Sequence, residues 1–101
     1  MSSNHTYWVY ILSNKTRSTL YIGITDNLER RISQHRAGEI PGFARQYHCI
    51  YLVYFEQFRN VRVAIAREKQ LKGWRRDKKN ALIAKKNPRW EDLAFDLYES
   101  D

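Results

Sequence analysis

The sequence predicts a small α+β domain in which a three-stranded antiparallel sheet is flanked by helices. Two observations predict this class. A hairpin of aromatic and β-branched segments opens the chain, and a third apolar segment follows a helical pattern and a loop. Capping residues and helix breakers then divide most of the remaining chain into helices. At 101 residues, 43% of them hydrophobic, the chain is expected to form one domain with a modest core.

Local patterns place the hairpin and the helix that follows it. Residues 7–12 and 19–24 are rich in aromatic and β-branched side chains and are predicted to be strands joined by a polar turn. Asp26 is expected to open a helix, with Glu29 three residues later in a capping-box arrangement. Gly38 is a natural C-terminal stop for that helix.

The next part of the chain is predicted to contain a loop, a strand and two helices. Residues 39–48 hold a proline and a glycine and are expected to form a loop. The nearly continuous apolar run 49–55 is typical of a central strand. Asn60 is expected to cap a helix that reaches about residue 74, and Asp77 to cap another through residue 86. With a short last helix, the predicted order is ββαβααα.

The C-terminal residues are expected to dock on the same domain. Pro88 disfavours a helical conformation in Asn87, so the preceding helix is expected to stop there. We expect the domain to span residues 5–86 and residues 87–101 to form an acidic C-terminal helix or tail. Three apolar residues have the spacing of a short helix: Trp90, Leu93 and Leu97.

The positive charge is concentrated in one part of the chain. The net charge is +7, and residues 59–89 carry twelve Lys or Arg against two acids, whereas residues 91–101 carry five acids and no Lys or Arg. A concentrated basic surface attracts a polyanion such as a nucleic-acid backbone. The alternative is a solvated helical face that aids solubility. Interleaving with Trp74 and Trp90 favours nucleic acid.

Composition argues against several classes of protein. Cys49 is the single cysteine, so an internal disulfide is excluded, and three scattered histidines give no zinc-ligand spacing. No apolar stretch approaches the ~18 residues of a membrane span, and residues 1–6 lack the pattern of a signal peptide. A cytoplasmic protein with Cys49 as a buried, inert thiol is expected.

One tyrosine of the hairpin stands apart from the other strand tyrosines. Because side chains alternate along a strand, Tyr21 and Gly23 share a face. A glycine there leaves room beside a tyrosine hydroxyl for a ligand or a backbone segment. Tyr7, Tyr51 and Tyr54 are instead interpreted as packed amphipathic rings.

Arg31 and His35 are neighbours on the first predicted helix, because they lie four residues apart. Their face adjoins Leu28 and Ile32, which should point at the core. The two residues can be an ordinary surface pair. They can equally form a phosphate site, since a guanidinium matches phosphate oxygens with two parallel hydrogen bonds. Both interpretations stay open at this stage.

Glu68 interrupts an apolar stripe on the helix that follows Asn60. An aliphatic residue is expected at this position, and an inward-facing carboxylate needs a basic partner or a metal ion. Lys72, four residues on, offers a salt bridge. Mg²⁺ offers the alternative, because it binds through one or two carboxylates together with phosphate and water. The residues of the stripe are Val61, Ala64, Ile65 and Leu71.

Together these residues resemble the signature of the GIY-YIG nuclease superfamily. Val9-Tyr10-Ile11 and Tyr21-Ile22-Gly23 are similar to its two halves, and the resemblance covers roughly residues 5–86. The small stand-alone proteins of that family look most similar, particularly through residues 67–74. Two positions depart from the pattern. Trp8-Val9 precedes the first tyrosine where the name has a glycine, and Ile24 stands where the excinuclease branch of the family has a lysine, which argues against a direct repair role by analogy.

The resemblance implies a metal-dependent nuclease that hydrolyses phosphodiester bonds in DNA. By resemblance, Tyr10 would act as general base and Tyr21 would position or share its proton. Arg31 and His35 would hold the phosphate, and Glu68 would bind Mg²⁺ or Mn²⁺. DNA is favoured over RNA, no membrane partner is expected, and the chain is expected to be a monomer or a weak homodimer. The residues expected to contact nucleic acid are Arg30, Lys72, Arg75, Arg76, Lys78 and Lys79.

Two other functions remain open. A catalytically silent nucleic-acid-binding module would keep the fold and the basic helices, and an accessory protein of a repair or processing complex would use the acidic tail to dock a partner. Neither needs the full set of site residues. In the family an asparagine often follows the metal-binding glutamate, and Asn80 and Asn87 are both candidates for it.

Overall fold

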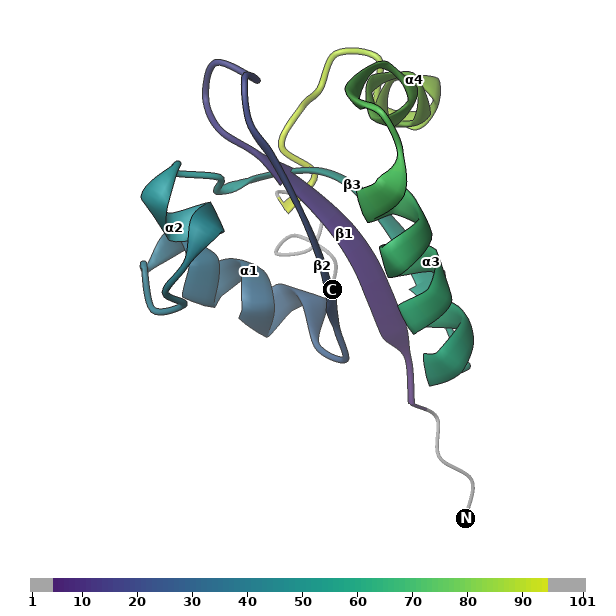
Figure 1. The fold of residues 1–101 in the computed structure, drawn as a ribbon. Coiled ribbons are helices and arrows are strands. Elements are labelled where there is room, and N and C mark those ends of the chain that lie inside the picture. The colour runs from purple at the N-terminus through teal and green to yellow at the C-terminus, as the bar shows by residue number, and fades with distance from the viewer. Residues whose placement is uncertain (1–4, 95–101) are drawn as a thin grey trace.

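The computed structural model describes residues 5–94 and confirms the α+β class. Three antiparallel strands form one sheet in the order β2-β1-β3, and helices lie on both of its sides (Figure 1). Among the described residues, no helix combines the length and apolar character needed to cross a membrane. The elements are β1 (Tyr7–Ser13), β2 (Leu20–Thr25), α1 (Leu28–Arg36), α2 (Phe43–Gln46), β3 (Tyr51–Phe58), α3 (Val61–Gly73) and α4 (Arg76–Lys86).

The central strand is β1, so the prediction that residues 49–55 form the central strand was wrong. This run belongs to β3, which is an edge strand. Its apolar character has another cause. Leu52 and Val53 are buried in the cores on opposite faces of the sheet, and residues 87–94 bond to the outer side of the strand. A covered edge strand can therefore be as apolar as a central one.

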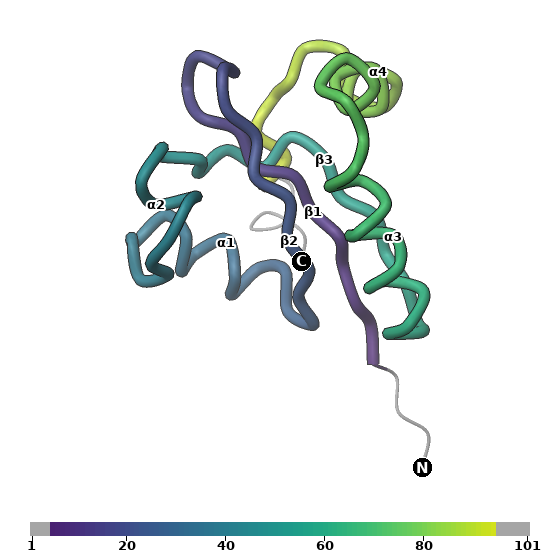
Figure 2. Tube along the Cα trace, viewed as in Figure 1, coloured from purple at the N-terminus to yellow at the C-terminus, as the bar shows by residue number. Residues whose placement is uncertain are grey.

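The two faces of the sheet carry two separate cores. Because side chains alternate along β1, Val9 and Ile11 pack with residues of α3 and α4, whereas Tyr10 and Leu12 pack with residues of α1 and α2. Figure 1 and Figure 2 show the two helix pairs on opposite sides of the sheet. The hairpin thus presents alternate side chains to two different environments.

Two predicted helix starts were wrong by one or two residues. The cap of α1 is Asn27, whose side-chain oxygen accepts the backbone N–H of Arg30 at 3.0 Å. The expected capping box of Asp26 and Glu29 is therefore not the cap. The residue before α4 is Arg75, and Asp77 lies in the first turn instead. An acid there still favours the helix, because it faces the positive end of the helix dipole.

Other helix ends agree with the prediction. Asn60 caps α3 by accepting the backbone N–H groups of Arg62 and Val63. Gly38 lies just beyond α1 with a φ of +72° and donates its N–H to the carbonyl of His35, as a helix-ending glycine does. The short helix α2 lies inside the segment 39–48, where only a loop was predicted.

The apolar stripe predicted on α3 is only partly correct. Ala64 and Leu71 are fully buried against the sheet, but Val61 and Ile65 are each 40% exposed. The helix therefore packs along a narrower line than its composition suggests. Glu68 lies four residues after Ala64 and three before Leu71, on that narrower line.

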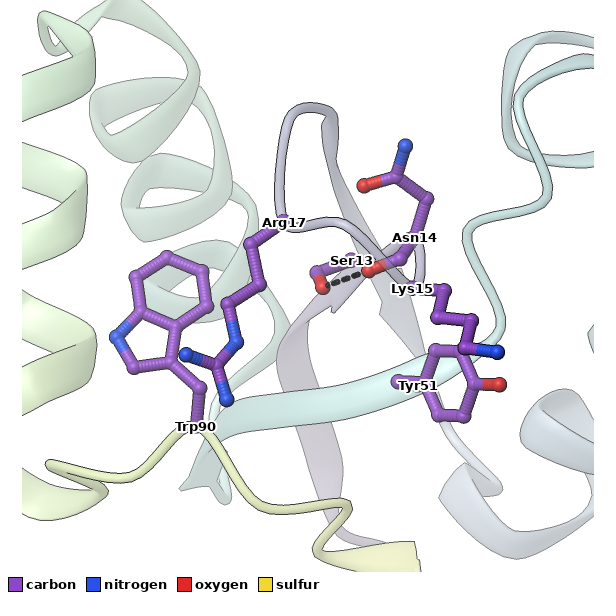
Figure 3. A pocket seen from close by; sticks show the side chains of 6 residues that line it. All are labelled: Ser13, Asn14, Lys15, Arg17, Tyr51 and Trp90. Atoms are coloured by element: carbon purple, nitrogen blue, oxygen red, sulfur yellow. Dashed lines mark hydrogen bonds between the residues drawn. The ribbon is translucent and has the colours of Figure 1, made fainter.

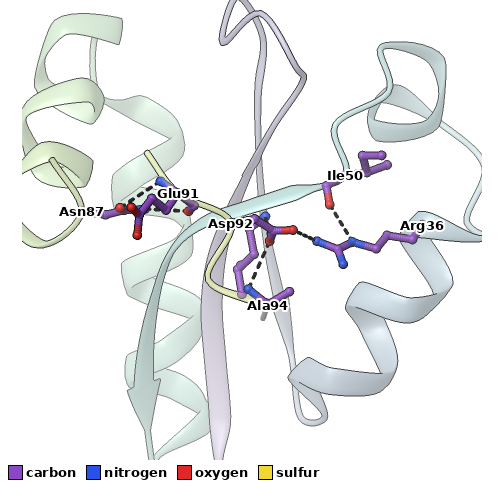
Figure 4. A network of polar contacts seen from close by, with 7 residues as sticks. Arg36, Ile50, Asn87, Glu91, Asp92 and Ala94 are labelled. Carbon is purple, nitrogen blue, oxygen red and sulfur yellow. Dashed lines mark hydrogen bonds and ion pairs between the residues drawn. The ribbon is translucent and has the colours of Figure 1, made fainter. Parts of the chain in front are cut away.

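Residues 87–94 follow α4 and pack against β3. The helix ends at Lys86 with Asn87 as its C-cap, as predicted. Asp92 accepts the backbone N–H of Leu52 and forms an ion pair with Arg36 of α1, so it joins three parts of the chain (Figure 4). Trp90 has a φ of +55°, which is incompatible with the predicted C-terminal helix beginning there. The rest of that prediction, including Leu97, lies outside the described residues.

Asn87→Ala is expected to destabilise the fold by about 1–3 kcal/mol, the usual cost of leaving buried polar groups unpaired. The Asn87 amide donates to the carbonyls of Val53 and Glu91 and accepts the N–H of Glu91, and the residue is 5% exposed. Chemical denaturation measures the change. Asn80→Ala is the matched control, because the Asn80 side chain accepts one exposed hydrogen bond from Arg76. An equal effect of both variants would contradict the structural role of Asn87.

Candidate active site

Four of the predicted site residues meet on the face of the sheet that α1 covers. Tyr10 is fully buried in β1, and its hydroxyl lies 3.0 Å from Nε2 of His35 on α1. The ring of Tyr21, on β2, lies 6.3 Å from that of Tyr10 and 5.5 Å from that of His35, between centroids. Arg31 is half-buried and interacts with the Tyr10 hydroxyl. The ordinary surface pair considered for Arg31 and His35 is therefore not what the structure shows.

Gly23 makes room for this arrangement. It lies directly opposite Tyr10 in the register of β1 and β2. A Cβ atom at position 23 would lie 2.4 Å from the hydroxyl oxygen of Tyr10, far inside van der Waals contact. Any side chain there would push the Tyr10 ring away from His35. The space that this glycine leaves is thus filled by Tyr10, whereas the sequence pointed to space beside Tyr21.

The environment of the cluster keeps both hydrogen-bonded partners uncharged at neutral pH. Burial raises the pKa of Tyr10 well above its ordinary value, the neighbouring Tyr21 adds to this, and the Arg31 guanidinium opposes it. Burial, assisted by the positive charge of Arg31, lowers the pKa of His35 from 6.5 to about 4. A neutral His35 can accept the phenolic proton of Tyr10 at Nε2.

Stability is expected to rise with pH between about 4 and 6.5 because of His35. In this window the unfolded chain binds a proton at His35 and the folded chain does not, since the folded pKa of about 4 lies below the unfolded value of 6.5. The contribution is fully present above 6.5 and is lost as the pH falls toward 4. Thermal unfolding across this range measures it. His35→Gln should flatten the profile above pH 4.5, and an unchanged slope would contradict the assignment.

Glu68 faces inward, as predicted, but from the opposite side of the sheet. Its side chain is 12% exposed on α3, and one carboxylate oxygen pairs with the ammonium of Lys72. The predicted salt bridge is therefore present. Among residues 5–94, no contact joins Glu68 to the tyrosine and histidine cluster, and no three acidic, His or Cys residues gather as a metal site. The group that could bind a metal ion at this position is the single carboxylate of Glu68.

The carboxylate next to this helix was not predicted as a functional feature. Glu56 of β3 pairs with Arg67 of α3 through two hydrogen bonds of 2.9 and 2.8 Å, and the Tyr54 hydroxyl also donates to Glu56. Arg67 immediately precedes Glu68 along the chain. The pair therefore fixes the part of α3 that carries Glu68 relative to the sheet. Sequence spacing gave no signal, because the partners lie on different elements.

The six cations predicted to contact nucleic acid have unequal environments. Arg30 and Arg75 have largely exposed side chains, and each forms a long ion-pair contact to an aspartate, at 4.0 and 3.8 Å. The Lys78 ammonium lies 4.3 Å from the centroid of the Trp74 ring. Arg76 donates to the carbonyls of Ser18 and Arg17 at the tip of the hairpin, so it also has a structural role. Lys79 lies half-buried on α4, and Lys72 pairs with the acid of α3 described above.

Neither asparagine lies in the tyrosine and histidine cluster. The Asn80 side chain accepts a hydrogen bond from Nε of Arg76 at 2.8 Å, within α4. Asn87 is buried and binds the backbone of β3 and of the following turn. Both amide groups therefore have local partners. The structure shows a structural contact for each.

Comparisons with known proteins point to the family that the residues of the tyrosine and histidine cluster resemble. A family model described as the GIY-YIG catalytic domain matches residues 6–81. A UPF0213 protein of Clostridium perfringens is 42% identical over 90 residues, which is 89% of this chain and 96% of that protein. A UPF0213 protein of Natronomonas pharaonis is 39% identical, over 83% of this chain and 95% of its own. These names state no activity.

A solved structure also matches. The solution NMR structure of the UPF0213 protein BH0048 from Bacillus halodurans superposes with a TM-score of 0.57 at 30% sequence identity. The match covers 87% of this chain and 93% of the other. The likeness therefore extends through the whole fold and not only through the hairpin.

Proposed function

Because the chain belongs to the GIY-YIG family of catalytic domains, we propose that it is a metal-dependent nuclease that hydrolyses phosphodiester bonds in DNA. One observation supports this most directly. Tyr10, Tyr21, Arg31 and His35 converge from three elements on one site. A structural core needs no such group, since burying His35 and partly burying the Arg31 cation costs free energy.

Tyr10 would act as the general base together with His35. A buried phenol with a raised pKa cannot hold a negative charge at pH 7 without help. Neutral His35, 3.0 Å away, provides an acceptor for the phenolic proton at Nε2. Tyr10 would take a proton from the attacking water as it passes its own proton to His35. The low pKa of His35, about 4 before reaction, would rise once the phosphodiester monoanion, or the further negative charge that develops in the transition state, lies nearby.

Tyr21 and Arg31 would orient the reacting phosphate. Tyr21 is half-buried whereas Tyr10 is fully buried, and their ring centroids lie 6.3 Å apart, so Tyr21 is the more accessible of the two to solvent. Its hydroxyl can position the water. The Arg31 guanidinium is half-buried and already interacts with Tyr10, so it can bind a phosphate oxygen and favour the anionic form of the phenol.

Glu68 fits a Mg²⁺ ion only in a site that water and the substrate phosphate complete. Mg²⁺ commonly binds through one or two carboxylates and keeps several waters, and Glu68 is an inward-facing single carboxylate. Lys72 shares that carboxylate and would compete with the ion. Glu68 lies on α3, across the sheet from the tyrosine and histidine cluster, so the substrate would have to reach both around the edge strand β2. A Mg²⁺ or Mn²⁺ ion held by Glu68 would supply charge stabilisation to the leaving oxygen there.

The second candidate function is a catalytically silent nucleic-acid-binding module. The Glu68–Lys72 ion pair favours it, because the proposed metal ligand already has a cationic partner. An assay with labelled single- and double-stranded DNA and RNA, with Mg²⁺ or with EDTA, separates the two functions. Cleavage that requires the metal supports the nuclease. Binding without cleavage of any of the four substrates would support the silent module.

The proposal also includes the domain bounds, the oligomeric state and the cellular compartment. We place the catalytic unit at residues 5–86, with residues 87–94 packed against it, and expect a monomer or a weak homodimer; the predicted docking of residues 95–101 falls outside the described part of the chain. A reducing, cytoplasmic setting suits Cys49, which is a free and buried thiol.

Binding to DNA is expected to weaken steeply with salt. The log–log slope should be about −0.7 to −0.9 for each phosphate contacted. Arg75→Gln removes a cation whose side chain is 91% exposed, so it should reduce the slope by about the value of one contact. Titrations at several salt concentrations measure this. A flat salt response of the unaltered protein would show that the basic segment serves solubility.

A further inference from the structure

A cavity of about 270 Å³ opens where the β1–β2 hairpin meets the start of β3 and the turn after α4. We call it the hairpin-end pocket. It is smaller than the ~300–1,000 Å³ of sites that enclose whole drug-sized ligands. Its walls combine two aromatic rings with two cations and polar groups. The lining residues are Ser13, Asn14, Lys15, Arg17, Tyr51 and Trp90.

The aromatic rings come from opposite sides of the pocket. Figure 3 shows Trp90 with the Arg17 guanidinium beside it on one side, and Tyr51 and Lys15 on the other. The guanidinium carbon of Arg17 lies 5.9 Å from the centroid of the Trp90 ring. Both rings are only half-buried. The interpretation of Tyr51 as a simple packed ring is therefore incomplete, because the residue also lines an open cavity.

Two groups in the pocket are available to a ligand. Within residues 5–94, the Lys15 ammonium and the Tyr51 hydroxyl have no hydrogen-bond or ion-pair partner. In the part of the chain that the structure describes, the Arg17 guanidinium donates one hydrogen bond, from Nη2 to the carbonyl of Arg89 at 2.9 Å. An aromatic surface next to cations with free donors is the arrangement that binds a nucleobase and its phosphate.

The backbone is strained at this place. Arg17 has a φ of +64° and Trp90 a φ of +55°, although neither is a glycine. Such residues persist only where the surroundings hold them, and they concentrate at functional sites. Here Arg76 holds the hairpin tip through two carbonyl oxygens, and Arg17 holds the turn after α4. The pocket is thus formed by segments that hydrogen bonds hold together: the hairpin tip, α4 and the turn after α4.

We propose that the hairpin-end pocket holds an unpaired nucleobase of a single-stranded segment that adjoins the cleavage site, an inference that rests on the proposed nuclease function. Ser13 lies three residues after Tyr10 on β1, about 10 Å along the strand at the usual rise, but Trp90 packs on the face of the sheet opposite to Tyr10, so a bound segment has to pass the end of the hairpin. A short single-stranded segment spans that distance. Paired bases in a duplex have both faces stacked on neighbours, so the preferred substrate has an unpaired end or flap.

The test is binding of a fluorescently labelled dT10 oligonucleotide, measured by anisotropy in EDTA so that no cleavage occurs. Tyr51→Leu removes one ring and should weaken binding about 5- to 150-fold, the value of stacking one base. Lys15→Gln changes an exposed side chain and should weaken binding by a smaller factor without affecting the fold. Arg17→Gly keeps the turn, because glycine adopts a positive φ freely, and should also weaken binding.

Matched controls lie at Arg45 on α2 and at Tyr47, the residue that caps its C-terminus, and both are exposed. Tyr47→Leu and Arg45→Gln should leave dT10 binding unchanged. A blunt duplex of the same sequence should bind the pocket variants and the unaltered protein equally. If Tyr51→Leu and Lys15→Gln bind dT10 as the controls do, the proposal is overturned. The proposal is also overturned if dTMP binds as tightly as dT10, because the pocket would then be a site for free nucleotides.

The outcomes separate this proposal from the nuclease function. A chain that binds dT10 through the pocket but never cleaves with Mg²⁺ supports the pocket and refutes the nuclease. A chain that cleaves with Mg²⁺ but shows no selective loss in the pocket variants supports the nuclease and refutes the pocket.

Discussion

Tyr10→Phe is expected to lose at least the ~10²–10⁴-fold in cleavage rate that positioned proton transfer contributes. The variant removes one oxygen and keeps a ring that is fully buried between β2 and α1. Packing should therefore survive. What disappears is the hydroxyl that lies 3.0 Å from His35 and interacts with Arg31. Single-turnover cleavage of a labelled duplex with an unpaired end, at saturating Mg²⁺, measures the loss.

Tyr54→Phe is the matched control. Tyr54 is another buried tyrosine, 2% exposed, but its hydroxyl donates to Glu56 on the opposite face of the sheet. Its loss should lower stability modestly and leave the cleavage rate near that of the unaltered protein. Tyr21→Phe should fall between the two, because its hydroxyl is expected to orient and not to accept the proton. Equal rates for the Tyr10 and Tyr54 variants would remove Tyr10 from the mechanism and leave His35 as the base.

Glu68→Gln is expected to abolish metal-dependent cleavage while nucleic-acid binding in EDTA stays nearly unchanged. The amide keeps the size of the side chain but is a poor ligand for Mg²⁺, which prefers anionic oxygen. Glu29→Gln, at an exposed position of α1, is the control and should cleave normally. Residual cleavage by Glu68→Gln that still depends on Mg²⁺ would refute the metal role.

Lys72→Gln distinguishes the metal role from the salt bridge. If Lys72 competes with the ion for the Glu68 carboxylate, removing its charge should lower the Mg²⁺ concentration needed for half-maximal cleavage. If the ion pair serves only the fold, Lys72→Gln and Glu68→Gln should destabilise the chain equally and the metal requirement should not move. A fully exposed pair at this spacing is worth only about 0.3–0.5 kcal/mol, whereas here the Glu68 side chain is 12% exposed and that of Lys72 52%. Unfolding measurements on both variants complete the comparison.

Local patterns in the sequence were enough to predict the fold class and most of its elements. The capping role of Asn60 and the stop at Gly38 depend on a few neighbouring residues, so they were predictable. The position of β3 at the edge of the sheet was not predictable, because an edge strand covered by later residues has the same apolar composition as a central one. The choice of Asn27 over Asp26 as the cap is a one-residue difference that composition does not resolve.

The candidate site, too, was predictable in part from the sequence and in part not. The helical spacing paired Arg31 with His35, and the resemblance to the nuclease family implied that Tyr10 and Tyr21 join them; the structure brings the four together. The pairing of Glu56 with Arg67 was not, because it depends on how α3 lies across the sheet. The hairpin-end pocket was also invisible, since its walls come from segments more than thirty residues apart.

The cover on the outer side of β3 also has a consequence for how copies of this chain avoid one another. An uncovered edge strand offers free N–H and C=O groups to any other strand, and is a common origin of aggregation. Here Leu93 donates its N–H to the carbonyl of Leu52, and Asp92 accepts the N–H of Leu52. The amide of Asn87 occupies the carbonyl of Val53. The segment 87–94 therefore covers the edge strand β3 within the same molecule and prevents strands of other copies from pairing with it.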